Sequence, residues 1–249
     1  MYFSKTLLLA ISSIFYSLVA TDQTYLFLSQ FITSNDLVFD VGAHQGNKTK
    51  KYLDHKCKVI CFEPQPQCIT ILKNKFSHHP AVIIEEVGLS KHTGEAEMLI
   101  CSQASTISTL SKQWATESRF SKLGFNWDRK ITIPLQTLDE MIKKHGLPKF
   151  CKIDVENHEL SVLQGLTHPI PFISIEVAIE TFDNTIACLD YLENLGYQKF
   201  NCTFGEIPKF LFPEWNTKDQ LIKNILEYIS SGHCHDQKDF WGDIYAAFQ

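Results

Sequence analysis

Short apolar runs alternate with segments of helical periodicity along most of this chain, from about residue 24 onward. The apolar runs are hydrophobic at consecutive positions, which is typical of strands whose two faces are both covered by helices. Strands of this kind that alternate with helices predict a doubly wound α/β fold with a mostly parallel sheet. The pattern predicts strands or extended pieces at 36–41, 58–63, 81–89, 96–101, 131–136, 150–156, 172–178 and 243–248, and helices at 24–32, 48–53, 65–76, 138–146, 158–166, 184–196 and 218–232.

The residues that end the predicted strands are the first candidates for function. In doubly wound sheets, ligands bind at the carboxyl ends of the strands, near the point where the strand order reverses. Five residues hold such positions, namely Asp40, Glu63, Val87, Asp154 and Glu176. Contacts with a ligand are therefore expected at these positions.

The loop after the first predicted strand, GAHQGNKT at 42–49, is close to a phosphate-binding loop without matching it. That pattern requires a glycine before the lysine, where this chain has Asn47. The dinucleotide pattern G-x-G-x-x-G also fails, because His44 occupies its second glycine position. Asp40 and Glu63 would in addition place two carboxylates beside a polyanion. A phosphate-loop nucleotidase is therefore the less favoured alternative.

A cationic nucleoside without phosphates, such as S-adenosylmethionine, fits this loop better. Gly42 allows the backbone to pass close beneath a ligand, and Asp40 can face the sulfonium or the ammonium of that ligand. Glu63 ends the second strand 23 residues after Asp40, where an acid commonly binds both ribose hydroxyls. For Asp40 the alternative is an N-cap of the following helix. The combination of these residues with Gly46 favours the cofactor site.

The composition restricts the number of domains and the partners. A chain of 249 residues with 44% hydrophobic residues can build one large α/β domain. The net charge of −5 and the lack of a long basic block in the sequence argue against nucleic acid as a partner. The eight cysteines form no C-x-x-C pair. We interpret most of them as small buried residues, which favours a reducing compartment.

The first 21 residues form an apolar leader, with one lysine followed by 14 mostly apolar residues. This run is shorter than the ~20 residues that span a bilayer. Leu18 also occupies the position where cleavage after Ala20 requires a small residue. A cleaved signal, an uncleaved anchor and an ordinary amphipathic helix all remain open. We expect a cytoplasmic protein, with attachment to the inner membrane face through residues 1–20 as an alternative.

Several segments together resemble one known family. They are FDVGAHQGNKT, VICFEPQPQCITILKNKF, LQTLDEM, CKIDVENHELSVLQG and ISIEV, and they span roughly residues 30–180. This combination resembles the FkbM-type S-adenosylmethionine-dependent methyltransferases, with F-E-P-x-P and K-I-D-V-E-x-H-E as the more specific motifs. GDIYAAF resembles the last strand of that family. Asn157 departs from the pattern, because the family usually has glycine at this position.

The resemblance implies a class I methyltransferase-like, Rossmann-like sheet of seven mostly parallel strands, with helices on both faces and an antiparallel last strand. Residues 22–249 would form a single domain that binds S-adenosylmethionine and methylates a hydroxyl oxygen of a small metabolite, sugar or glycan. A catalytically silent cofactor-binding protein of the same fold is the alternative. The resemblance also implies that Asp40, Gly42, Ala43 and Gly46 line the cofactor loop, that Glu63 binds the ribose, and that Val87 and Gly88 lie beside the adenine.

Methyl transfer to an alcohol requires positioning of the acceptor and removal of its hydroxyl proton. The strand that contains K-I-D-V-E brings Asp154, Glu156 and His158 to the binding edge, so these are the candidate catalytic residues. His158 has the ordinary pKa best suited to a general base, and a buried Asp154 could also serve. As the alternative, His158 is a surface residue at a helix start. Lys152 would point opposite to its strand neighbours Cys151 and Ile153, and it could either pair with an acid or act in catalysis.

Two further features affect the expected site. Asp154, Glu156 and Glu176 could gather as oxygen ligands for Mg²⁺, but they show no tight ligand spacing. HCHD at 233–236 lacks a second cluster of ligands, so no metal site is predicted. The segment 102–130 is rich in Ser, Thr and aromatic residues and interrupts the core pattern. We interpret it as an insertion that covers the site as a lid, with an ordinary surface insertion as the alternative.

Overall fold

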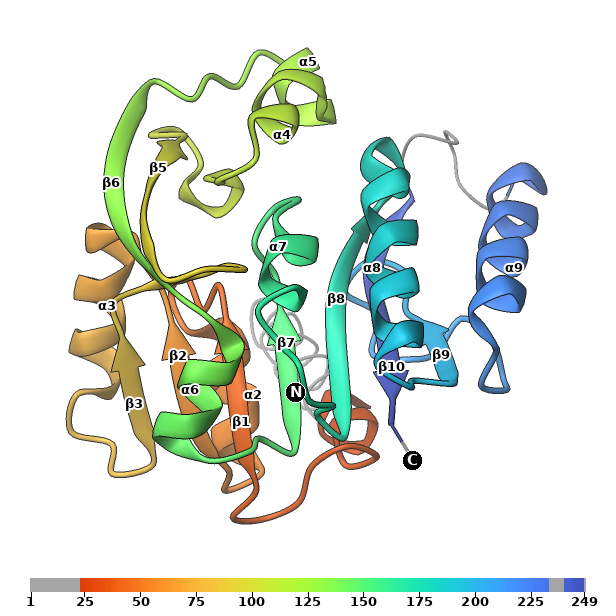
Figure 1. The fold of residues 1–249 in the computed structure, drawn as a ribbon, viewed down its shortest axis with the longest axis horizontal. Coiled ribbons are helices and arrows are strands. Elements are labelled where there is room, and N and C mark those ends of the chain that lie inside the picture. The colour runs from red at the N-terminus through yellow and green to blue at the C-terminus, as the bar shows by residue number, and fades with distance from the viewer. Residues whose placement is uncertain (1–22, 233–239, 249) are drawn as a thin grey trace, which may run out of the picture.

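The main sheet of the computed structural model has seven strands in the order β3-β2-β1-β7-β8-β10-β9 (Figure 1). All neighbours from β3 to β8 pair in parallel, whereas β10 is antiparallel to both β8 and β9. This confirms the predicted doubly wound, mostly parallel sheet and its antiparallel last strand. The strands are β1 (Leu37–Val41), β2 (Lys58–Phe62), β3 (Val82–Glu85), β7 (Phe150–Ile153), β8 (Phe172–Ala178), β9 (Lys199–Cys202) and β10 (Trp241–Ala247).

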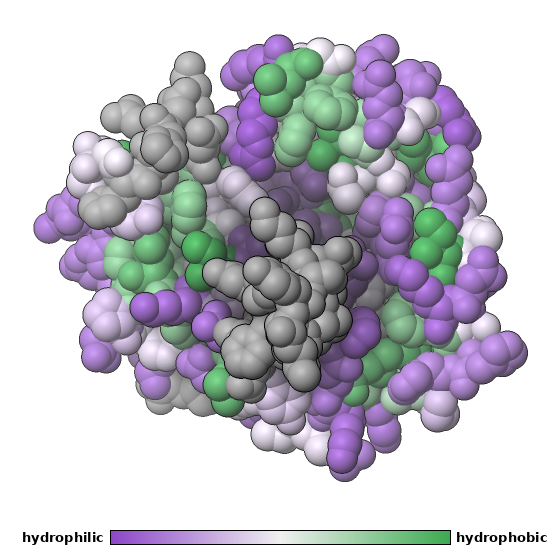
Figure 2. Space-filling model, turned by 180° about the vertical axis from the view of Figure 1, so that it is seen from behind, coloured by the Kyte–Doolittle hydropathy of each residue, from purple (hydrophilic) through white to green (hydrophobic). Residues whose placement is uncertain are grey.

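The structure describes residues 23–232 and 240–248. The predicted apolar leader at 1–21 and the HCHD stretch at 233–236 lie outside these residues. Within the two described ranges, no helix is both long enough and apolar enough to cross a membrane. Seen from behind, the molecule shows many hydrophilic residues with smaller apolar patches between them (Figure 2).

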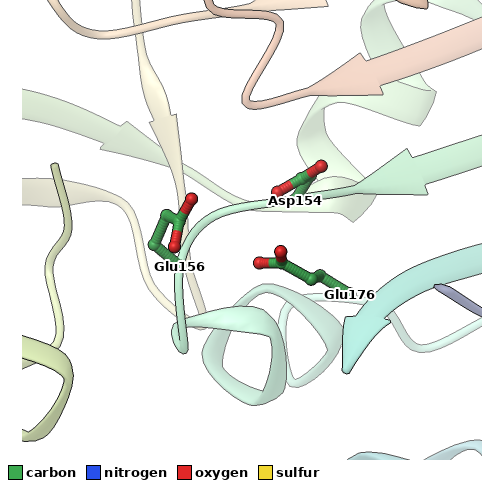
Figure 3. A group of neighbouring side chains, drawn as sticks. All are labelled: Asp154, Glu156 and Glu176. Carbon is green, nitrogen blue, oxygen red and sulfur yellow. The ribbon is translucent and has the colours of Figure 1, made fainter. Parts of the chain in front are cut away.

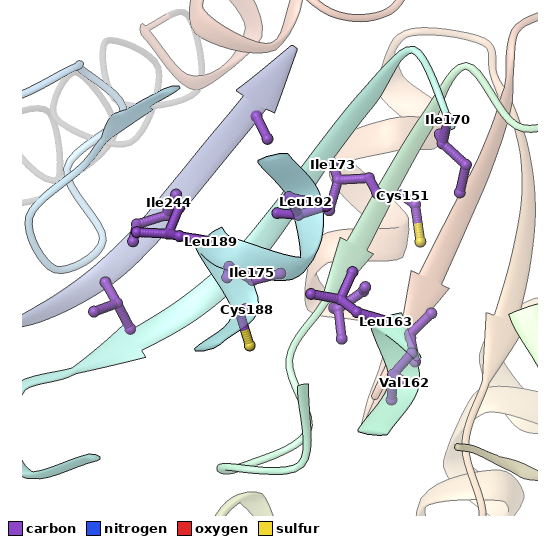
Figure 4. Close-up of a cluster of buried hydrophobic side chains, with 14 of the residues drawn as sticks. Cys151, Val162, Leu163, Ile170, Ile173, Ile175, Cys188, Leu189, Leu192 and Ile244 are labelled. Atoms are coloured by element: carbon purple, nitrogen blue, oxygen red, sulfur yellow. The ribbon is translucent and has the colours of Figure 1, made fainter. Parts of the chain in front are cut away.

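Helices cover both faces of the sheet, because successive strand residues point to opposite sides. On one face, strand residues such as Ile175 pack with side chains of α6, α7, α8 and α9, and Leu189 of α8 belongs to this cluster (Figure 4). On the other face, Val38 and Phe150 pack with side chains of α2, α3 and the helix at 23–28. The helices are α2 (Asn47–Asp54), α3 (Pro66–Phe76), α6 (Leu138–His145), α7 (Glu159–Leu163), α8 (Phe182–Asn194) and α9 (Lys218–Ser230).

The predicted third strand at 81–89 is too long. β3 ends at Glu85, and Gly88–Leu89 form β4, which pairs with β6 in a separate sheet. This sheet has the order β4-β6-β5, and β5 (Gly94–Ile100) and β6 (Arg129–Gln136) correspond to the two extended pieces predicted nearby. The sequence stays apolar after Glu85 because Leu89 is buried in the core. β3 itself does not continue to Leu89.

The segment 102–130 forms short helices above the carboxyl ends of the central strands (Figure 1). Ser111 and Ser118 begin two of these helices, where their hydroxyls accept hydrogen bonds from backbone N–H groups. Capping thus explains part of the serine content of this segment. Trp114 of this segment is buried. The elements are η1 (Ser105–Ile107), α4 (Lys112–Glu117) and α5 (Arg119–Lys122).

Candidate active site

The loop between β1 and α2 depends on two glycines with left-handed backbone conformations. Gly42 and Gly46 both have φ of 80°, a region that favours glycine. A Cβ atom on Gly42 would lie 1.9 Å from the carbonyl oxygen of Asp154. A Cβ atom on Gly46 would lie 2.4 Å from the ring of Phe76 in α3. The close approach that Gly42 permits is therefore to the chain segment just after β7, which ties this loop to the acidic end of that strand.

Glu63 follows β2, and backbone groups hold its carboxylate in place. Its Oε2 accepts a hydrogen bond from the backbone N–H of His44 and its Oε1 accepts one from the N–H of Gln65, each at 2.8 Å. Burial raises the pKa of Glu63 to about 7, although these backbone hydrogen bonds lower it. A carboxylate has about four lone-pair sites, so both oxygens can still accept a hydrogen bond from a ligand.

The insertion contacts the residues around Glu63. The hydroxyl of Ser105 lies 2.8 Å from Nε2 of His44, and the Gln65 side chain donates to the Ser105 carbonyl at 3.2 Å. His44 and Gln65 were not among the residues predicted for the site. Gln65 belongs to the E-P-Q-P stretch, where the flanking prolines restrict the backbone. This restriction is the sequence feature that could have identified Gln65 as a site residue.

A cavity lies at the carboxyl ends of β1, β2 and β7, the edge of such a sheet at which ligands bind. Met98, Leu110 and Ile133 give it an apolar wall, and Thr106 comes from the insertion. Ala43 lines a neighbouring cavity, while Asp40 and Gly46 line neither. The predicted site residues that line the first cavity are Gly42, Glu63, Val87, Gly88, Asp154, Glu156 and His158.

Asp40 lies beneath the loop and not in the cavity. It is buried, and its Oδ2 accepts a hydrogen bond from the Thr49 hydroxyl of α2 at 2.6 Å. Burial raises the pKa of Asp40 to about 6, while the Thr49 hydrogen bond and nearby Lys152 lower it. Gly46 is the N-cap of α2, so Asp40 is not an N-cap. Its observed contact joins β1 to the first turn of α2.

Three carboxylates converge beside the cavity. Asp154, Glu156 and Glu176 each offer one oxygen, and these oxygens lie within 4.8 Å of one another (Figure 3). Burial raises the pKa of Glu156 and of Glu176, and neighbouring carboxylates raise both further. Such a set of oxygens could hold a hard cation such as Mg²⁺ or face a cationic ligand. The sequence indicates this group through the positions of its members at predicted strand ends and not through their spacing, because β8 contributes Glu176 from a separate part of the chain.

The turn after β7 explains the departure from the family pattern at Asn157. Glu156 and Asn157 have φ of 57° and 69°, and asparagine tolerates this left-handed region better than most residues. The insertion supports the turn, because the Thr109 hydroxyl donates to the Glu156 carbonyl at 2.6 Å and the Asn157 amide donates to the Ser111 hydroxyl at 3.0 Å. Asparagine thus takes the conformation that glycine would provide.

His158 is partly buried at the start of α7, with its Nε2 3.1 Å from the hydroxyl of Ser90. Burial lowers the pKa of His158 to about 4, and the charge of Lys91 lowers it further. The imidazole is therefore neutral near pH 7 and a weak base. The argument that its ordinary pKa suits general base catalysis does not hold in this environment.

A Rossmann-like sheet whose antiparallel last strand β10 lies between β8 and β9, with an acid-lined cavity at its carboxyl edge, is typical of class I methyltransferases. Residues 40–199 match the model of the methyltransferase FkbM domain. This match covers more than half of the chain, which therefore belongs to the FkbM family of S-adenosylmethionine-dependent methyltransferases.

One curated relative and several solved structures are similar to this chain. Hexuronic acid methyltransferase AglP of Haloferax volcanii is 28% identical over 150 residues, which are 57% of this chain and 56% of that protein's length. Precorrin-6y C5,15-methyltransferase from Geobacter metallireducens has a TM-score of 0.47 at 12% identity, over 91% of this chain and 87% of that chain. A TehB-like SAM-dependent methyltransferase from Corynebacterium glutamicum has a TM-score of 0.43 at 8% identity, over 96% and 97%.

Proposed function

We propose that this methyltransferase transfers its methyl group to a hydroxyl oxygen of a small metabolite, sugar or glycan. The observation that carries the proposal is the junction of two cavities. The cavity at Glu63 shares Asp154 and Glu156 with a second, more open cavity, which Phe120 and Trp241 also line. A cofactor in the first cavity and an acceptor in the second would meet at these two carboxylates.

The first cavity fits the cofactor. The fixed oxygens of Glu63 would accept hydrogen bonds from the ribose hydroxyls, and the apolar wall of Met98 and Ile133 beside Val87 and Gly88 would contact the adenine. The carboxylates at its other end complement a cation. S-adenosylmethionine supplies an electrophilic methyl group when it is bound.

The acceptor hydroxyl must lose its proton at the junction. We assign Asp154 as the group that accepts or directs this proton, because it lines both cavities and its Oδ2 lies 3.2 Å from the Lys152 ammonium. Glu156 would bind the acceptor beside it, since its raised pKa favours a protonated carboxyl that can donate a hydrogen bond. His158 would hold Ser90 and the start of α7 in place as a neutral hydrogen-bonding residue.

A sugar is the acceptor class that two features support. Phe120 and Trp241 offer aromatic surface in the open cavity, where aromatic side chains can pack against an apolar sugar face. The similarity to hexuronic acid methyltransferase AglP points to the same class. We also propose that the insertion at 102–130 acts as a lid, since its residues line both cavities.

The test combines binding and turnover. S-adenosylhomocysteine should bind the purified full chain with a 1:1 stoichiometry in calorimetry. Methyl transfer from labelled S-adenosylmethionine should then follow with at least one member of a panel of hexoses, hexuronic acids and their glycosides, and mass spectrometry should place the methyl group on oxygen. Binding without transfer to any hydroxylated acceptor would indicate a catalytically silent protein.

We also propose that the protein acts in a reducing compartment such as the cytoplasm, and its cysteines support this proposal. Cys57, Cys61, Cys68, Cys101, Cys151, Cys188 and Cys202 are all buried and free. Disulfides persist mainly in oxidising compartments. Alkylation after unfolding without a reductant, followed by mass mapping, should find these thiols reduced, and a disulfide between any two of them would contradict the assignment.

A further inference from the structure

Charged residues of four neighbouring strands lie on one face of the sheet at the proposed reaction edge. In the register of the sheet, Lys152 of β7 is paired with Asp40 of β1, and Asp243 of β10 is paired with Glu176 of β8. Asp154 follows Lys152 by two positions, so strand alternation directs both toward the same side. Lys152 therefore lies among carboxylates contributed by several strands.

Lys152 makes ion pairs with two of them. Its Nζ lies 2.8 Å from Oδ1 of Asp243 and 3.2 Å from Oδ2 of Asp154. The side chain of Lys152 is 3% exposed, that of Asp243 is 15% exposed and that of Asp154 is 33% exposed. The lysine is thus the buried centre of the group, and Asp154 is the member that lines the two cavities of the proposed reaction site.

Asp243 is itself fixed by the neighbouring strand. The backbone N–H of Thr203, just after β9, donates to the Asp243 carbonyl at 2.8 Å, and the Thr203 hydroxyl accepts from the Asp243 N–H at 3.3 Å. Burial alone would lower the pKa of Lys152, but Asp154, Asp243 and Glu176 raise it well above its ordinary value. The ammonium therefore stays charged at any pH at which the protein works.

We propose that Lys152, anchored by Asp243, is a positioning residue that fixes the Asp154 carboxylate at the junction of the two cavities. A free aspartate at the end of a strand has several rotamers. The ion pair with the buried Lys152 ammonium, which Asp243 also binds, selects the Asp154 rotamer whose Oδ2 faces that ammonium. The proposal rests on the proposed function only in that the cofactor's sulfonium is near Asp154.

The test measures whether the effect of Asp154 depends on Lys152, without requiring the acceptor. Sinefungin carries an amine where S-adenosylmethionine has its sulfonium, and S-adenosylhomocysteine is neutral there. The ratio of their affinities, measured by calorimetry, reports on the carboxylate that faces the cation. Asp154→Asn is introduced into the wild type and into Lys152→Met, Lys152→Arg and Asp243→Asn, and each pair forms a double-mutant cycle.

Asp154→Asn should lower the sinefungin preference by about fivefold or more in the wild type and in Lys152→Arg, as expected for loss of a close charge pair. In Lys152→Met and in Asp243→Asn the same substitution should change it less than about twofold. If Lys152→Met does not fold, the Asp243→Asn cycle decides, because that variant keeps the buried lysine charge.

An equal effect of Asp154→Asn in all four backgrounds would show that Lys152 only joins strands, and it would overturn the proposal. No effect in the wild type would overturn it as well, since Asp154 would then not face the cation. Failure of the wild type to bind either ligand would instead refute the proposed function, which makes the two failures distinguishable.

Discussion

Replacing Glu63 by glutamine tests the proposed cofactor site most directly. Glu63 is 2% exposed, and its two carboxylate oxygens accept hydrogen bonds from the backbone N–H groups of His44 and Gln65. Glutamine has nearly the same shape, but its NH₂ group would face one of these N–H donors and its charge is lost. The ribose hydroxyls would then meet one neutral oxygen in place of two charged ones.

The magnitude follows from the strength of hydrogen bonds to charged groups. Such bonds contribute about 1.5–3 kcal/mol, against about 0.5–1.5 kcal/mol for neutral ones. A combined loss of about 1.5–3 kcal/mol for Glu63→Gln weakens binding of S-adenosylhomocysteine roughly tenfold to a hundredfold. Glu95→Gln replaces an exposed acid of β5 and should leave the affinity unchanged.

The same site predicts a pH dependence with a definite sign. Because burial raises the pKa of Glu63 to about 7, the carboxylate is protonated as the pH falls through 7 and loses acceptor capacity. Binding of S-adenosylhomocysteine should therefore be constant above about pH 8 and weaken below pH 7. Glu63→Gln should remove this slope. Asp40 and Glu159, with pKa values of about 6 and 7, remain in the variant, so loss of the slope would assign the titration to Glu63.

Calorimetry at several pH values between 5.5 and 8.5 checks both expectations, and thermal unfolding shows whether each variant is folded. Unchanged affinity in Glu63→Gln, with the fold intact, would remove this residue from the ribose site. A pH slope that persists in the variant would assign the titration to another group.

Three further changes follow from the backbone and from His158. Gly42→Ala should lower the free energy of unfolding in urea by about 3 kcal/mol or more, because φ of 80° and a Cβ 1.9 Å from a carbonyl oxygen both destabilise the variant. Gly232→Ala is the control, since Gly232 has the same φ with nothing within 4 Å of the added Cβ, and it should lower the free energy of unfolding by only about 1–2 kcal/mol. Equal losses would refute the steric argument. Asn157→Val should destabilise the protein by about 1–2 kcal/mol while Asn157→Gly does not exceed about 1 kcal/mol, and the reverse order in chemical denaturation would contradict the assigned turn. The pKa of His158 is lowered to about 4, so its contribution to stability is present above pH 6.5 and is lost as the pH falls through 4. His158→Asn should therefore flatten the decline of the free energy of unfolding between these pH values. Turnover of this variant near pH 7 should stay within several-fold of the wild type.

The fold could be predicted from the sequence because its signals are local. A run such as Val59 to Phe62 is buried at every position, and that pattern identifies a covered parallel strand without knowledge of its neighbours. Glu63 could be placed for the same reason, since its position at the end of β2 follows from the strand itself. The end of the helix at Gly146 likewise follows from a short stretch of chain.

The parts that could not be predicted depend on pairings between distant segments. β10 lies between β8 and β9, and only this arrangement brings Asp243 to Lys152. The side of the sheet that the last side chain of each strand faces also depends on pairing between distant segments. Asp40 shares its face with Val38, which packs against α2, so its carboxylate bonds Thr49 of that helix and not a ligand.

The charges at this edge argue for one kind of cofactor and against another. Glu63, Asp154 and Glu156 line the same cavity, and Glu176 joins the last two within 4.8 Å, while the buried Lys152 is already shared by Asp154 and Asp243. A ligand rich in phosphate would bring further negative charge to a place where burial already raises the pKa of three acids, Glu63, Glu156 and Glu176. A cationic nucleoside relieves that repulsion and lets Glu63 and Glu176 ionise, so its binding should release protons near neutral pH. Calorimetry of sinefungin in buffers of different ionisation enthalpy should therefore show net proton release. Net proton uptake would mean that the acids are not in contact with the cation.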